Sequence, residues 1–140
     1  MIDLDKLRDE HRDILRIVDR LRLLIAGSSP PPPLHLLSLR HQLSSTLIGH
    51  LKAEDWLLYP PLLDSRDQHI AATARAFIEE MGGLGVAYRA HCEQWNAVAI
   101  AADWAGYCRD SRILLDALTT RVKRENRELY PLLEVLAQAA

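Results

Sequence analysis

The chain has 140 residues, of which 49% are hydrophobic and 26% charged, a composition typical of a soluble globular protein with one domain, residues 1–140. Its formal net charge of −2 comes without a basic arm or patch, which argues against nucleic acid as a partner. No apolar run reaches the about 20 residues that a membrane span needs, and the charged N-terminus does not resemble a signal peptide, so we expect a cytoplasmic protein without a membrane partner.

Two amphipathic helices are predicted in the first half of the chain. Residues recurring every three to four positions place one inward face on the first helix: Leu4, Leu7, His11, Ile14, Val18, Leu21 and Ile25. Gly27 ends this helix, and prolines 30–33 form an extended connector. The second helix is predicted from about Leu34 to about Leu63, with an inward face of Leu36, Leu43, Leu47, His50, Glu54 and Leu57.

Two more helices are predicted in the second half. The third has an inward face of Ile70, Ala74, Phe77, Met81, Leu84, Tyr88, His91, Trp95 and Val98, and glycines 82, 83 and 85 permit a bend in its middle. The fourth runs from about Asp103 to about Leu136, with Leu114, Leu118, Arg121, Glu125, Leu129 and Leu132 inward and a kink expected at Pro131. Four long helices with short connections predict an all-α, up-down-up-down four-helix bundle.

The second and fourth helices carry related sequences. Residues 50–63 read HLKAEDWLLYPPLL, and residues 121–133 read RVKRENRELYPLL. In this alignment Arg121 stands opposite His50, and Glu125 stands opposite Glu54. The Leu-Tyr-Pro sequence that follows is shared by both segments. The match suggests two helix pairs related by a pseudo-twofold axis.

A polar layer is predicted inside the bundle, where the pattern otherwise calls for leucine. His50, Glu54 and Glu125 occupy inward positions, and buried carboxylates need a partner or a metal ion. A histidine four residues before a glutamate points from the same face of a helix, so both can reach one ion. Counting along the helices adds three positions at the same depth: His11, Met81 (or its neighbour Glu80) and Arg121. His69 and His91 lie farther along the axis, at about 15 Å.

These segments resemble the hemerythrin-like, HHE cation-binding family through DEHRDI in the first helix, HLKAEDWLLYP in the second and RVKRENRELYPLL in the fourth. The resemblance implies a hemerythrin-like bundle. It also implies a pair of irons held by one histidine each from helices one and three and by His-x-x-x-Glu from helices two and four. His11, His50, Glu54 and Glu125 match this ligand set. The resemblance also implies the family's functions, which include oxygen binding and sensing of oxygen, iron or nitric oxide.

Two positions depart from the family's ligand set. Met81 stands at the helix-three histidine, and Arg121 stands at the helix-four histidine. Arginine stays protonated and cannot bind a metal, so we expect Arg121 to pair with Glu54 or Glu125 where a second ion would sit. The metal site is therefore predicted to be degenerate and mononuclear at most.

Three functions remain open from the sequence. The chain is a non-haem iron protein with one metal, most plausibly iron, on His11, His50, Glu54 and Glu125, completed by Glu80 or water, for oxygen, nitric oxide or iron sensing or storage. Alternatively, it is a metal-free regulatory module that binds a protein partner, or an oxygen-dependent enzyme. We expect a non-enzymatic regulatory or sensor role. Trp56 and Trp104 at the edges of the bundle are expected to be packing residues, but an exposed pair would mark a dimer face, which leaves a homodimer open.

Overall fold

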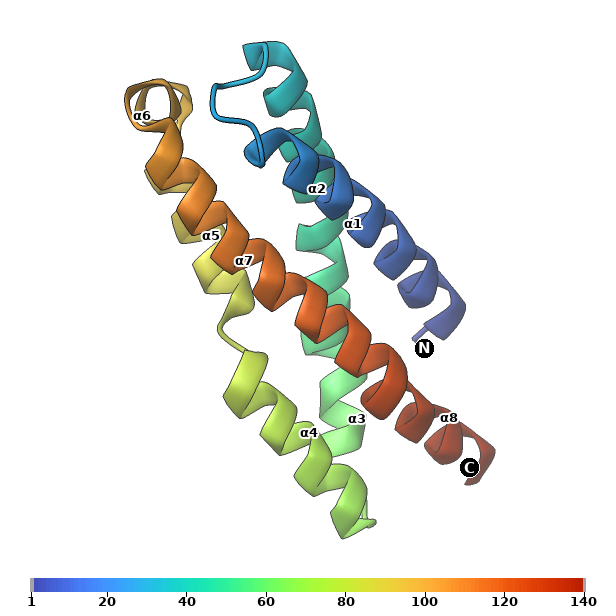
Figure 1. Ribbon diagram of the computed structural model, residues 1–140. Helices are drawn as coiled ribbons and strands as arrows, with labels where there is room; N and C mark the ends of the chain where they lie inside the picture. The colour runs from blue at the N-terminus through green and yellow to red at the C-terminus, as the bar shows by residue number, and fades with distance from the viewer. Residues whose placement is uncertain (1, 140) are drawn as a thin grey trace.

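The long helices lie side by side in the computed structural model, which describes residues 2–139 (Figure 1). The α-helices are α1 (Leu4–Ile25), α2 (Pro33–Ala53), α3 (Tyr59–Leu63), α4 (Gln68–Met81), α5 (Leu84–Gln94), α6 (Ala97–Ala102), α7 (Trp104–Arg124) and α8 (Tyr130–Ala139). Two π-helical turns, η1 (Glu54–Leu58) and η2 (Glu125–Leu129), join α2 to α3 and α7 to α8. No strand occurs in this range. The predicted all-α bundle is confirmed.

The predicted third helix is not continuous, which corrects the sequence interpretation. It breaks at Gly82 and Gly83 into α4 and α5, and the separate short helix α6 follows. A Cβ atom at Gly82 would lie 2.5 Å from the carbonyl oxygen of Ile78, so the break requires glycine there. Val98, predicted to face inward, is 79% exposed because α6 starts anew after the Asn96 cap.

Two wide π-helical turns change which side chains face the interior. In η1 the Tyr59 N–H bonds to the Glu54 carbonyl, and in η2 the Tyr130 N–H bonds to the Glu125 carbonyl. Each turn precedes a proline, whose ring crowds the carbonyl four residues earlier and has no N–H to donate. The turn brings Leu58 and Tyr59 inside together, while Leu57, predicted to face inward, is 49% exposed.

The polar layer separates two hydrophobic clusters. One cluster gathers residues of α1, α2, α5 and α7 around Leu47, Leu118 and Tyr107. The other gathers residues of α3, α4 and α8 around Leu62, Phe77 and Tyr130. The interior of the bundle is therefore apolar on both sides of the candidate site. None of the helices described is both long and apolar enough to cross a membrane.

Candidate metal centre

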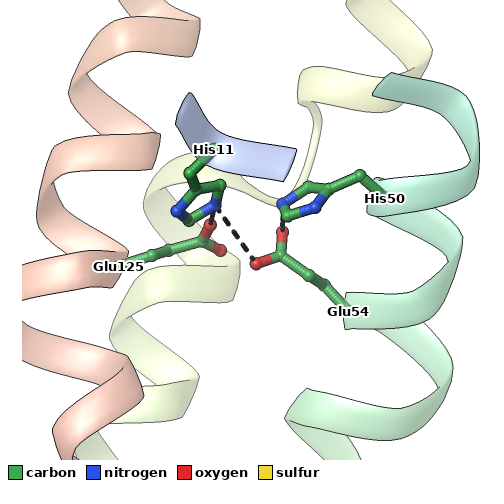
Figure 2. Close-up of side chains that lie close together, drawn as sticks. All are labelled: His11, His50, Glu54 and Glu125. Carbon is green, nitrogen blue, oxygen red and sulfur yellow. Dashed lines mark ion pairs between the residues drawn. The ribbon is translucent and has the colours of Figure 1, made fainter. Parts of the chain in front are cut away.

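The four predicted metal ligands come together at one point in the bundle (Figure 2). His11 lies on α1, His50 near the end of α2, and Glu54 and Glu125 at the first positions of the two π turns. None of these residues is more than 1% exposed. One ligand atom from each lies within 4.8 Å of the others, which is close enough for all four to contact one cation.

The two histidines present their Nε2 atoms to the centre of this group. The Nδ1 atom of His11 lies 2.7 Å from the Asn126 side-chain oxygen, and that of His50 lies 3.0 Å from a Glu10 oxygen. Both partners accept hydrogen bonds, so each Nδ1 carries the hydrogen. Each Nε2 atom then keeps its lone pair, as in metal-binding histidines, where a second residue orients the ring in this way.

These lone pairs point at carboxylate oxygens. The Nε2 atom of His11 lies 3.2 Å from Oε1 of Glu125 and 3.0 Å from the Tyr130 hydroxyl oxygen, and that of His50 lies 3.4 Å from Oε1 of Glu54. His50 Nε2 and Glu125 Oε1 are buried without a hydrogen-bond partner. Electron pairs that face one another in this way are stable only with a proton or cation between them. Two imidazole nitrogens and two carboxylates suit iron, manganese or zinc, so the residues fit one such ion.

Arg121 bonds to both carboxylates. Its NH2 group donates at 3.1 Å to Oε1 of Glu54, the oxygen that also faces His50, and its Nε–H donates at 3.2 Å to Oε2 of Glu125. Its NH1 group donates to the backbone carbonyl of Met81 at 3.2 Å. That carbonyl is free because α4 ends at Met81, and a helix C-terminus attracts a cation. Met81 thus joins the layer through its backbone.

A family comparison agrees with this geometry. Residues 3–133 match the model described as the hemerythrin HHE cation-binding domain. The chain belongs to this family. Searches of curated proteins and of solved structures gave no further match. Hemerythrin-like domains bind metal, and this one contains a His/Glu cluster that can hold an ion. Metal binding by this chain stays a prediction.

Two tyrosines complete the layer of this hemerythrin-like domain, and they were missed in the sequence interpretation. The Tyr130 hydroxyl donates to Glu54 at 2.7 Å, and the Tyr59 hydroxyl donates to Glu125 at 2.9 Å. The Tyr130 ring also stacks on His11, with 4.9 Å between ring centroids. The repeated Leu-Tyr-Pro sequence could have indicated these tyrosines. Each tyrosine follows the glutamate of its own helix by five residues and donates a hydrogen bond to the glutamate of the other helix.

We expect Tyr130→Phe to lower the free energy of unfolding by about 1.5–3 kcal/mol, because a buried carboxylate oxygen loses its donor. Tyr88→Phe is the matched control. The Tyr88 hydroxyl bonds to the neutral Ser44 hydroxyl at 2.6 Å, so its loss should cost about 0.5–1.5 kcal/mol. Urea unfolding of metal-free protein measures both. If both variants lowered the free energy of unfolding equally, the hydrogen bond to Glu54 would stabilise the protein no more than a neutral hydrogen bond does.

The two carboxyl groups of the hemerythrin-like site differ in acidity. Burial raises the pKa of Glu54, but the adjacent His50 ring and Arg121 outweigh burial and hold this pKa at about 2. Burial and the negative charge of Glu54 together raise the pKa of Glu125 to about 7. Burial lowers the pKa of His50, but the neighbouring Glu54 and Glu10 carboxylates outweigh burial and raise it. Glu125 and His50 are therefore where the metal-free layer holds protons near neutral pH.

The remaining candidates lie outside the layer. Glu80, considered as a further ligand, is exposed and forms an ion pair with Arg124 at the surface. That position corrects the expectation that it could complete the site. His69 is exposed, as predicted. The His91 Nε2 atom hydrogen-bonds to Ser111 at 3.1 Å, in agreement with its prediction as a core histidine.

Proposed function

We propose that this hemerythrin-like domain is a non-enzymatic regulatory or sensor module that binds one metal ion through His11, His50, Glu54 and Glu125. The observation that carries the proposal is the pair of inward Nε2 lone pairs that face carboxylate oxygens, with His50 Nε2 and Glu125 Oε1 unpartnered. A cation between these atoms would satisfy all four groups. Iron is the proposed metal; when bound, it would supply redox chemistry and affinity for a small gas such as dioxygen or nitric oxide.

Charge supports a single ion. The layer contains two carboxylates, and the Arg121 guanidinium bonds to both. Two carboxylates and one guanidinium leave a net charge of −1 in the layer, which one divalent cation is enough to neutralise. Repulsion from the fixed positive charge of Arg121 opposes a second cation. A one-ion site suits sensing better than storage, which needs many ions.

Burial supports a non-enzymatic role. The four ligands are at most 1% exposed, and Tyr59, Tyr130 and Arg121 close the layer around them. An organic substrate could not reach the ion without opening the bundle, whereas a diatomic gas is small enough to diffuse through a protein interior. We therefore favour a signal-receiving role over substrate turnover.

A metal-free scaffold is the second candidate, and one observation favours it. Arg121 makes three hydrogen bonds, to Glu54, Glu125 and the Met81 carbonyl, and so neutralises part of the layer without metal. In that case protons on Glu125 and His50 would replace the ion. The domain would then act through a protein partner or through a second copy of itself.

Metal content decides between the two candidates. Freshly purified protein should contain close to one transition metal per chain by plasma mass spectrometry, and His50→Ala should contain close to none. His69→Ala is the matched control, since this exposed histidine lies outside the layer, and its metal content should equal that of the wild type. Two metals per chain would refute the role assigned to Arg121. No metal, even after anaerobic reconstitution with iron, would favour the scaffold.

A further inference from the structure

Arg40 on α2 is a half-buried arginine without an acidic partner. The other arginines in residues 2–139 that are not exposed all form ion pairs: Arg8, Arg22, Arg121 and Arg124. The guanidinium of Arg40 instead lies over the ring of Tyr107, with 5.7 Å from its central carbon to the ring centroid. Arg40 precedes His50 by ten residues on one helix, which is about 15 Å along the axis. It therefore belongs to a different part of the bundle from the candidate metal centre.

An apolar groove opens beside Arg40 at the surface. The groove has a volume of about 250 Å³ and is lined by residues of the connector that leads into α2, of α2 and of α6. Its walls are apolar side chains, which include Pro30, Pro33, Leu34, Leu37 and Ile100, and Arg40 is the charged residue among them. Leu34 and Leu37 are 79% and 57% exposed, so the rim presents apolar surface to solvent.

A small cavity lies on the inner side of the same arginine. It has a volume of about 20 Å³, enough for one water-sized group, and its lining is mostly apolar, with Arg40, Tyr88, His91 and Ser111 among its polar members. Burial and the charge of Arg40 both lower the pKa of His91. No carboxylate lines this cavity or the groove. Arg40 thus lies between the apolar groove and the small inner cavity, and it forms no ion pair with the described residues.

We propose that this end of the bundle binds a medium-chain monocarboxylate, with the carboxylate on Arg40 and the alkyl chain in the groove. The planar guanidinium can donate two parallel hydrogen bonds to a carboxylate, and the inner cavity has room for one of its oxygens. The groove, with a volume of about 250 Å³ and apolar walls, has room for an alkyl chain of several carbon atoms. Charge complementarity selects an acid over a neutral or cationic amphiphile of the same length.

Octanoate is the probe, and isothermal titration calorimetry of the full chain is the measurement. We expect saturable binding at one site, and shortening the acid by one methylene should weaken it about fourfold until acetate shows none. Octanol and octylammonium, with the same chain, should bind more weakly. His50→Ala, which removes a candidate metal ligand, should bind octanoate as the wild type does, so this site can succeed or fail independently of the metal.

Arg40→Met keeps much of the side-chain length and removes the charge. It should weaken octanoate binding about 10- to 100-fold, the loss of a charge-assisted pair of hydrogen bonds. Arg89→Met, at an exposed arginine on α5, is the matched control and should bind normally. Leu37→Asp, at an exposed groove position, should also weaken binding, and it provides a test if Arg40→Met folds poorly. The proposal is overturned if octanoate does not saturate, if octylammonium binds equally well, or if folded Arg40→Met retains full affinity.

Discussion

Arg121→Ala is expected to lower the free energy of unfolding of the metal-free protein by about 3–5 kcal/mol. The substitution removes the cation that bonds to Glu54 and Glu125 and leaves two buried carboxylates side by side. It also removes the donor to the Met81 carbonyl, which ends α4 at the break in the third helix. Two buried carboxylates and one part-buried carbonyl thus each lose a donor in one step, and the tyrosine hydroxyls still donate to the carboxylates.

Arg124→Ala is the matched control for this prediction. Arg124 lies one turn along α7 and pairs with Glu80 and Glu128, but both of these residues are exposed. Its loss should therefore cost no more than about 1 kcal/mol. Urea unfolding followed by circular dichroism gives both values. If Arg121→Ala proved as mild as Arg124→Ala, the guanidinium could not be what stabilises the layer.

Saturating metal is expected to raise the free energy of unfolding by about as much as Arg121→Ala lowers it. A ligand at a thousand times its dissociation constant adds about 4 kcal/mol when it binds only the folded state. For a domain of this size the melting temperature should rise by on the order of 10 °C. Iron(II) under anaerobic conditions and zinc are the ions to test by calorimetry. His50→Ala should show no rise, whereas His69→Ala should show the full effect; a rise of equal size in His50→Ala would mean that the ion binds elsewhere.

The metal-induced rise in melting temperature should increase with pH. The pKa of Glu125 is raised to about 7 in the folded state, so its protonated form stabilises the metal-free protein at low pH. This contribution is complete below the unfolded pKa of about 4.5 and is lost as the pH rises through 7. The raised pKa of His50 acts in the same direction. A metal needs both groups deprotonated, so the metal-induced shift in melting temperature should be larger at pH 8 than at pH 6.

Helical periodicity was enough to predict the bundle, because long amphipathic helices have few other ways to bury their inward faces. It was not enough for the middle of the third helix. The glycines at 82 and 83 predicted a bend, but whether a helix bends or stops depends on tertiary contacts, here Arg121 bonding to the Met81 carbonyl. The prediction that Leu57 faces inward was wrong for a related reason. Periodicity assumes 3.6 residues per turn, and the π turn before Pro60 departs from that value.

At the site, the sequence predicted which residues would lie together but not which neighbours would hydrogen-bond to them. His11, His50, Glu54, Glu125 and Arg121 were expected in one layer, and the structure brings them together. The partners that orient the histidines were not foreseen, since Glu10 and Asn126 look like ordinary surface residues next to inward positions. Such partners depend on rotamers and helix rotation, which a spacing pattern does not specify.

The crossed bonds from Tyr59 to Glu125 and from Tyr130 to Glu54 make each helix pair dependent on the other. Each glutamate takes its tyrosine donor from the other half of the chain, so neither half forms its complete set of hydrogen bonds alone. Substitutions in one half should then show epistasis with the other.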